Sequence, residues 1–204
     1  FANGQSLRRQ LEDETPDETQ FGGNGMQIRM IGAGADDITY FNFDRIRSVE
    51  QREFATKKYI IADSVQKLNW KLTGQTKTIL GHTCQQATTQ RIMERMTMNI
   101  ENGVPKRTMV ADTMNITAWF TPAIPVPAGP EYQGQLPGLI LAIDVNNGRT
   151  VFQAVEISPK VDAGLIKEPK NGKKVTLDEF NKERDKVLDE MQRNGGGNRR
   201  VIRA

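Results

Sequence analysis

The sequence predicts an α+β fold, built mainly from antiparallel β-strands and completed by one C-terminal amphipathic helix. Short segments rich in β-branched and aromatic residues recur from residue 26 to residue 158, with no long helical pattern between them. A stretch of strict alternation is interrupted by Asn102-Gly103, and a capping-box sequence starts an amphipathic stretch at Thr176. The expected sheet is a curved meander, which could curl into a half-barrel.

The chain is expected to form one β-rich domain between two extensions. Its 204 residues are enough for one substantial core and few for two. Residues 1–25 are predicted to be an N-terminal arm, either a loop or a fraying helix, because its charged run is too short to be a stable isolated helix. The single domain is expected over residues 26–194. Residues 195–204 are expected to be a Gly-rich basic tail, in which residues 198–204 are either mobile or an added edge strand.

Most of the expected strands follow from period-two patterns. Met26–Ile31 alternates, and Ile38–Phe43 is rich in aromatic and β-branched residues. Residues 159–172 are expected to be a connection. Further short strands are expected at Ser48–Ala55, Lys57–Ala62, Leu68–Leu72, His82–Thr89 and Thr150–Ser158.

A long β-hairpin gives the clearest local signal. Residues 92–101 and 104–110 alternate, and Asn102-Gly103 between them supplies the two residues with positive φ that a type I′ turn requires. The second strand is expected to continue into Ile116–Phe120. Methionine concentrates in these strands, where its side chains either fill gaps or form adaptable interfaces, and several in one hairpin favour an interface. Met96 and Met98 are therefore candidate partner-binding residues, together with Asn102 and Gly103.

The segment from Ile116 to Val155 holds five of the nine prolines. Within it, Leu136-Pro137-Gly138-Leu139 most simply encodes a type II turn, in which Pro fixes φ and Gly supplies positive φ. The apolar residues on both sides of this turn could instead form an exposed knob for a partner.

Two aromatic residues, Trp119 and Phe120, are adjacent in the expected strand. Period two predicts that one faces the core and the other faces the opposite surface of the sheet. The alternative is an aromatic platform for a sugar or a peptide, formed together with Tyr132.

A helix is predicted over about residues 176–193. Thr176 and Glu179 have the spacing of a capping box, in which each side chain bonds to the other's backbone N–H. The apolar residues that follow share one helical face. They are Leu177, Phe180, Val187, Leu188 and Met191.

Composition argues against several classes of protein. Lys and Arg number 28 and Asp and Glu 25, and no basic stripe is interleaved with aromatic residues, so a nucleic-acid binder is not expected. No apolar run is long enough for a transmembrane helix. Cys84 is the only cysteine, which excludes an intramolecular disulfide and a Cys-based metal site within one chain. No metal or cofactor is expected.

No catalytic residue is predicted either. His82 is the only histidine, and no acidic residue lies within four positions of it. Cys84 would share its face, but a cysteine buried in a strand is usually inert. Asp144, Glu131 and Glu156 could in principle be paired carboxylates for hydrolysis. They are more simply residues of loops and strand ends.

Several blocks of the sequence are specific enough to carry a resemblance. In order, they are Trp70–Thr73, Thr76–Thr89, Thr117–Pro125, Gly129-Pro130 and Leu136–Leu141. Together they resemble the GLPGLI family, a group of Bacteroidetes cell-envelope proteins that are mostly of unknown function. Gln135 replaces the first Gly of the family motif, and Gly134 next to it could serve the turn instead. The hairpin at residues 92–110 is longer than the usual family link.

The resemblance implies an exported protein, periplasmic or associated with the outer membrane, whose signal peptide has been removed or lies outside this sequence. It further implies a non-enzymatic subunit or accessory of an outer-membrane assembly of the TonB-dependent-transporter type, with a protein as its partner. The alternative is a carrier that binds an apolar lipid or peptide in the curved sheet. The candidate partner-binding residues are Met96, Met98, Asn102, Gly103, Trp119, Leu136, Pro137, Gly138, Leu139, Arg199 and Arg200.

Overall fold

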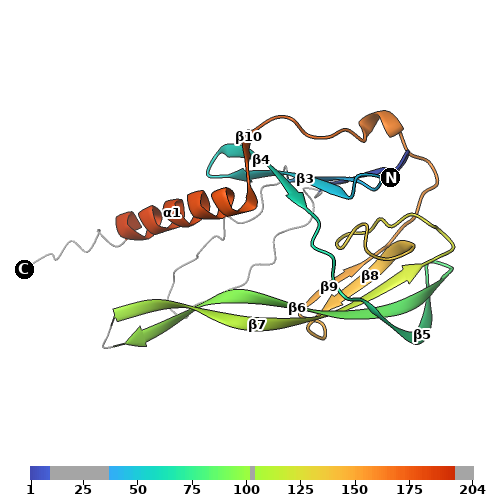
Figure 1. Ribbon diagram of the computed structural model, residues 1–204, viewed down its shortest axis with the longest axis horizontal. Coiled ribbons are helices and arrows are strands. Elements are labelled where there is room, and N and C mark those ends of the chain that lie inside the picture. Colours follow the sequence, from blue (N-terminus) through green and yellow to red (C-terminus); the bar gives the residue numbers. More distant parts are fainter. Residues whose placement is uncertain (10–36, 102–103, 196–204) are drawn as a thin grey trace, which may run out of the picture. The chain divides into compact units, whose positions relative to one another are not determined.

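The computed structural model describes residues 1–9, 37–101 and 104–195 (Figure 1). The expected strand Met26–Ile31, most of the N-terminal arm and almost all of the C-terminal tail lie outside the described residues. The chain divides into two compact units, residues 1–65 with 162–204 (unit 1) and residues 66–161 (unit 2). One β-rich domain was expected over residues 26–194, whereas each unit here contains its own five-stranded sheet.

The elements confirm a mainly antiparallel α+β protein with a C-terminal helix. Unit 1 contains sheet A, in the order β1-β2-β3-β4-β10, and helix α1, whereas unit 2 contains sheet B, in the order β5-β6-β7-β8-β9. The elements are β1 Gln5–Arg9, β2 Ile38–Asn42, β3 Arg47–Phe54, β4 Lys57–Ser64, β5 Lys71–Ile79, β6 His82–Glu101, β7 Val104–Thr121, β8 Leu139–Val145, β9 Thr150–Gln153, the 3-10 turn Ala163–Leu165, β10 Lys173–Val175 and α1 Leu177–Gly195.

The first strand of sheet A corrects the prediction for the N-terminal arm. β1 pairs antiparallel with β2, with Leu7 opposite Tyr40, where a loop or fraying helix was expected. The charged run has only marginal helix propensity by itself, and a strand that can complete its ladder against β2 gains backbone hydrogen bonds that an isolated helical turn does not secure. Tertiary pairing therefore decides the conformation of Gln5–Arg9.

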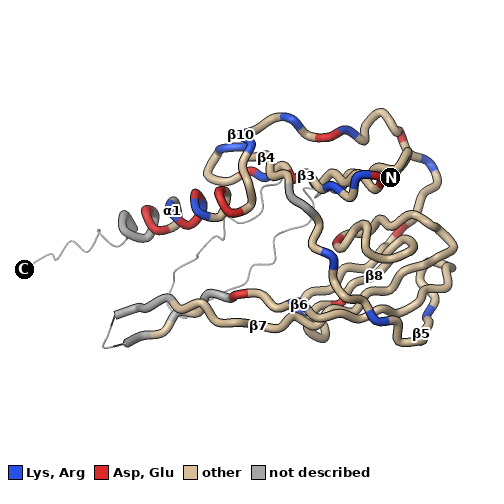
Figure 2. The backbone as a smooth tube through the Cα atoms, in the orientation of Figure 1, with Lys and Arg blue, Asp and Glu red and all other residues tan. Residues whose placement is uncertain are grey.

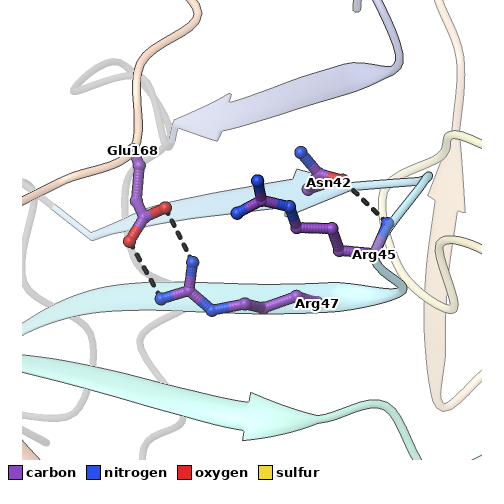
Figure 3. Close-up of polar contacts among 4 residues, drawn as sticks. All are labelled: Asn42, Arg45, Arg47 and Glu168. Atoms are coloured by element: carbon purple, nitrogen blue, oxygen red, sulfur yellow. Dashed lines mark hydrogen bonds and ion pairs between the residues drawn. The ribbon is translucent and has the colours of Figure 1, made fainter.

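One face of sheet A is covered by the chain that returns from unit 2. Tyr40, Val49 and Ile60 form a buried cluster on this face, against which Leu7 and Ile166 pack. The strand period of two places these side chains on one side of the sheet. A bidentate ion pair fixes the returning segment, since the two terminal nitrogens of Arg47 donate to the carboxylate oxygens of Glu168 at 2.8 and 2.9 Å (Figure 3).

Helix α1 covers the other face of sheet A. Phe180 is buried among Phe54, Tyr59, Ile61 and Val175, with its ring edge-on to those of Tyr59 and Phe54 at centroid distances of 5.2 and 6.3 Å. Acidic and basic residues are interspersed along the helix, as expected for its solvated side (Figure 2).

The predicted capping box is confirmed. The Thr176 N–H donates to the Glu179 carboxylate at 2.8 Å, and the Glu179 N–H donates to the Thr176 hydroxyl at 3.2 Å. Just before it, β10 pairs in parallel with β4, with Val175 opposite Ile61. The sequence did not reveal this strand, because three residues are too few to show a period.

Sheet B encloses a core of its own. Ile116, Ala118 and Phe120 of β7 are almost completely buried, and Ala87 of β6 lies directly opposite Ala118. Ile140 and Ile143 of β8 complete this face, and Trp70, Tyr132 and Leu136 pack against it from outside the strands. Paired alanines at its centre leave room for those larger side chains.

Strand β5 begins later than predicted. It runs from Lys71 to Ile79, rather than from Leu68 to Leu72, so it also ends later than predicted. Its pairing with β6 is irregular between Leu72 and Thr76, where Gly74 has φ 79°. Leu68 and Trp70 instead contact the core of sheet B from beyond the strand.

The Leu136–Leu139 segment does not form the predicted type II turn. Gly138 is not among the residues with positive φ, and its N–H donates to the Leu136 carbonyl at 2.9 Å. Gly134 does have positive φ, at 77°. Glycine is needed at position 138 because a Cβ atom there would lie 2.3 Å from the carbonyl oxygen of Thr121. A close backbone approach, and not backbone handedness, explains this glycine.

Among the described residues, no helix has the length and apolar composition needed to cross a membrane.

A candidate protein-interaction surface

Strands β6 and β7 extend beyond the other strands of sheet B (Figure 1). Strand β5 pairs with β6 only as far as Thr88, and β8 pairs with β7 only as far as Ile116. Residues 90–101 and 104–115 therefore pair only with each other among the described strands. We refer to this two-stranded extension as the ribbon.

The ribbon confirms the predicted hairpin. Glu101 lies opposite Val104, so that Asn102-Gly103 are the two residues between the strands. The conformation of this turn, and with it the predicted type I′ geometry, lies outside the described residues. At the base of the ribbon, the Gln90 amide donates to the Asn115 side-chain oxygen at 2.9 Å.

Large apolar side chains are exposed on both faces of the ribbon. Ile92 is 76% exposed and Met109 55%, and strand alternation places both on one face. Met93 is 40% and Val110 43% exposed on the other. An isolated two-stranded hairpin is only marginally stable in water, and exposed apolar patches usually mark contact sites. Ribbon residues 92, 93, 109 and 110 thus form a candidate interaction surface.

The hydrogen bonds of Asn115, at the base of the ribbon, show which backbone groups of the two strands face its open edges. The Asn115 N–H donates to the Asn146 side-chain oxygen and its carbonyl accepts from the Asn146 N–H, both at 2.8 Å. The backbone groups of Asn115 therefore point away from β6. In an antiparallel ladder such residues alternate, and their cross-strand partners also point outward. Ile92 and Glu94, which lie opposite Thr113 and Ala111, therefore direct their N–H and C=O groups to the open β6 edge.

Six of the predicted partner-binding residues lie wholly or with their side chains outside the described part of the structure. Met96 and Met98 belong to β6 and lie opposite Met109 and Arg107, but their side chains lie outside the described part of the structure. Asn102, Gly103, Arg199 and Arg200 lie outside the described residues altogether. The apolar residues that are seen on the ribbon are instead Ile92, Met93, Met109 and Val110.

Trp119 lies on the surface of sheet B opposite its core. Phe120 is 1% exposed, whereas Trp119 is half-buried, so the prediction that one ring faces the core and the other faces outward is confirmed. The Lys77 ammonium group lies 4.4 Å from the centroid of the Trp119 ring, in a cation–π arrangement.

The predicted knob at the Pro-Gly segment is not formed. Leu136 and Leu139 are 4% and 8% exposed, and Leu136 belongs to the core of sheet B. Of the four residues from Leu136 to Leu139, only Pro137 is exposed. Gly138 lies in close contact with the Thr121 backbone. The sequence could not distinguish an exposed loop from one that folds back, because Leu and Ile are compatible with both.

Gln135 has a role that sequence reasoning missed. Its side-chain oxygen accepts hydrogen bonds from the Leu68 N–H and from the Trp70 indole, each at 3.1 Å. The Trp70 ring in turn meets Tyr132 edge-on, at a centroid distance of 5.6 Å. One side chain thus ties the segment before β5 to the loop before β8. The only signal in the sequence was that Gln135 stands where the GLPGLI motif, which this segment resembles, has its first glycine.

Two residues that were considered for catalysis, Cys84 and Asp144, make contacts that stabilise the local fold. The Cys84 thiol is buried and lies 3.5 Å from the His82 carbonyl, and burial raises the pKa of the thiol. Asp144 accepts from the Gly148 N–H at 2.7 Å, across the turn between β8 and β9. Over the described residues, no cluster of three or more His, Cys, Asp or Glu side chains has the arrangement of a metal site.

Unit 1 carries a polar cluster between α1, β10 and β4. Lys173 and Glu183 form an ion pair that lowers the pKa of Glu183 and raises the pKa of Lys173. The Tyr59 hydroxyl also bonds to Glu183, although burial is the main reason that the pKa of Tyr59 is raised. This cluster joins the helix to its sheet.

Fold and surface together define a two-unit, mainly antiparallel β-protein with a projecting ribbon. The model of a family described as a protein of unknown function (Porph_ging) matches residues 70–142, which is less than half of the chain. This segment starts at Trp70 and includes the Leu136–Leu141 block. A search of curated proteins finds no match.

Two solved structures of PNGF-II, in space groups C2 and P21, are similar to this chain. They share 21% and 20% identity with it, have TM-scores of 0.49 and 0.48, and cover 74% and 72% of its length. The match covers only 25% and 24% of the PNGF-II chains, so this chain spans about a quarter of their length.

Proposed function

We propose that this chain is a non-enzymatic interaction protein of the cell envelope, exported to the periplasm and associated with the outer membrane. Its role is that of a subunit or accessory of an outer-membrane assembly, such as one built around a TonB-dependent transporter. The envelope location and the type of assembly rest on the resemblance to the GLPGLI family. The mode of action rests on the ribbon.

The observation that carries the proposal is the exposure of Ile92, Met93, Met109 and Val110 on a hairpin that leaves its sheet. Burying an apolar side chain of this size on a partner contributes about 1.5–3 kcal/mol. Leaving such side chains in water costs free energy, and a two-stranded hairpin that pairs with no third strand is only marginally stable. Both effects favour binding of the ribbon to a partner. A protein partner can cover both faces of the ribbon.

The alternative function, a carrier of an apolar lipid or peptide in a half-barrel, has less support. The core face of sheet B is covered by Trp70, Tyr132 and Leu136 of the same unit, so side chains of the protein occupy the position that such a ligand would take there. Lipid that co-purifies stoichiometrically with the protein would favour the carrier.

The proposal is tested by site-specific photocrosslinking in living cells of a species that carries this chain. A photoreactive residue replaces Ile92 in one variant and Val155 in a matched control, which is 87% exposed in unit 2 but lies outside the ribbon. Crosslinks from position 92 are expected to capture a protein that mass spectrometry identifies as an outer-membrane component. Position 155 should not capture it.

A second variant removes most of the ribbon without altering the sheet. Joining Arg91 to Met114 through Asn-Gly retains a pair that lies an even number of steps from the Glu101–Val104 pair, so the shortened strands meet with the same hydrogen-bonding parity. The shortened protein should fold and lose its partner. Location in the cytoplasm, or equal capture from both crosslinking positions, would overturn the proposed function.

A further inference from the structure

The two edges of the ribbon differ in whether another strand can be added. On the β7 edge, both backbone groups of Asn115 are already bonded to Asn146. Alternation from Asn115 brings Pro105, in the same strand, to that edge. Proline has no N–H to donate, and proteins use it to block edge-to-edge pairing. The β7 edge is therefore interrupted at both ends.

The β6 edge has neither obstacle. Gln90, Ile92 and Glu94 direct their backbone groups to this edge, and residues 96, 98 and 100 continue the alternation. None of them is proline. In the described part of the chain, no strand pairs with β6 beyond Thr88 on this side. An open edge of this length is a template for one more strand.

The charges along β6 restrict how two such edges can pair with each other. In an antiparallel pair related by a two-fold axis, an axis at Glu94 or at Arg95 places a charge opposite itself, and one at Met93 places Arg91 opposite Arg95. Axes at Met96 and at Met98 both place an arginine opposite Glu101 without like-charge pairs. The axis at Met96 pairs the longer segment, residues 91–101, and places Arg91 of each strand opposite Glu101 of the other, and Ile92 opposite Ile100. Opposite charges and apolar pairs that face each other across strands are favourable, whereas like charges are not.

We propose that the β6 edge pairs with the same edge of a second copy of this chain, about a two-fold axis at Met96, to give a four-stranded antiparallel sheet. This inference rests on the proposed function, because it assigns the ribbon as the interaction surface. Self-pairing satisfies the open edge without another protein and gives the two-stranded ribbon the additional strands that hairpins need for stability. The faces of the ribbon stay available to the envelope partner.

Proline substitutions on each edge of the ribbon distinguish pairing through the β6 edge from other contacts between two copies of the chain. Glu94 and Ala111 lie opposite each other, and the N–H groups of both point outward. Proline at either position therefore spares the β6–β7 ladder, but only Glu94→Pro removes donors from the proposed interface. Sedimentation equilibrium should show a dimer for the native chain and for Ala111→Pro. In Glu94→Pro, dimerisation should be weaker by about tenfold or more, since each dimer loses two hydrogen bonds. Glu94→Gln controls for the lost charge and should dimerise normally.

Crosslinking checks the register of the proposed pair. In a Cys84→Ser background, Met96→Cys should be joined to its copy by a short bifunctional thiol reagent, whereas Met109→Cys, its cross-strand partner on the β7 edge, should not. A native chain that stays monomeric at all concentrations, or equal effects of the two prolines, would overturn the inference. If such a monomer still captures its outer-membrane partner through position 92, the proposed function stands alone. A dimer that captures nothing would overturn the proposed function instead.

Discussion

Gly138 lies so close to the backbone of Thr121 that a Cβ atom at position 138 would be 2.3 Å from the Thr121 carbonyl oxygen. The Thr121 side chain is fully buried, and its hydroxyl oxygen has no hydrogen-bond partner. The contact holds the residue before β8 against the last residue of β7. The pairing of the two strands then begins with Leu139 opposite Thr121. Both residues can be tested by substitution, because both tryptophans of the chain lie in unit 2 and report its unfolding.

Gly138→Ala should destabilise unit 2 by about 3 kcal/mol, since the added methyl group collides with backbone atoms that cannot move independently. The matched control is Gly148→Ala, where φ is 91° but no atom lies within 4 Å of the added carbon. It should cost only the 1–2 kcal/mol or so of a left-handed residue with a side chain. Urea unfolding followed by tryptophan fluorescence measures both. Equal costs would show that packing against Thr121 is not what requires glycine.

Thr121→Val should leave the stability of unit 2 unchanged or raise it by up to about 1 kcal/mol, because it replaces a buried hydroxyl that has no partner with a methyl group of similar size. Thr89→Val is the contrasting variant. The Thr89 hydroxyl donates to the Asn69 carbonyl at 3.0 Å, so its loss should cost about 1 kcal/mol. The same unfolding experiment compares them, and a clear loss of stability in Thr121→Val would indicate that its hydroxyl has a partner.

Gln135→Met should destabilise unit 2 by about 1–3 kcal/mol, because it keeps the length of the side chain but removes the acceptor shared by Leu68 and Trp70. The emission of Trp70 should change as its indole N–H loses its partner. Gln153→Met, at an exposed position of β9, is the control and should have little effect. If the two substitutions are equivalent, Gln135 does not hold the segment before β5 in place.

The ion pair between Lys173 and Glu183 should make the stability of unit 1 depend on pH at both ends of the range. Because the pKa of Glu183 is lowered in the folded state, its contribution is present above the ordinary pKa of a glutamate and is lost as pH falls through the lowered value. The pKa of Lys173 is raised, so its contribution is present at neutral pH and is lost as pH rises through the raised value.

The measurement is the urea midpoint of Glu183→Gln relative to the native chain, followed by circular dichroism across pH. The difference should be largest near neutral pH and should shrink under acid, below about pH 4.3, where a free glutamate is protonated. Glu190→Gln, an exposed substitution on the same helix, controls for the removal of one negative charge. A difference independent of pH would rule out the ion pair as its cause.

Much of the fold was predictable from local patterns. The capping box at Thr176, the register around Asn102-Gly103 and the opposite orientations of Trp119 and Phe120 follow from rules that involve only neighbouring residues. These features depend on backbone geometry over a few positions, and the sequence displays such geometry directly.

What could not be predicted depends on contacts between distant segments. The pairing of β1 with β2 spans the undescribed residues, and the parallel pairing of Lys173–Val175 joins positions more than a hundred residues apart. The role of Gly138 required knowledge of where Thr121 lies. For the candidate surface, the hairpin was predicted, but the exposed fractions of Ile92 and Met109 depend on where β5 and β8 end.

The division of the chain also sets an order of events during synthesis. Unit 2 is one continuous segment, whereas unit 1 begins before it and is completed only by β10 and α1 after it. As domains tend to fold when their residues have emerged, sheet B can close while sheet A still lacks an edge strand and Phe54 and Tyr59 still lack the cover of Phe180. Residues 1–65 are therefore made before unit 2, but their sheet is completed after it. A chain interrupted before residue 177 would expose the face that α1 covers.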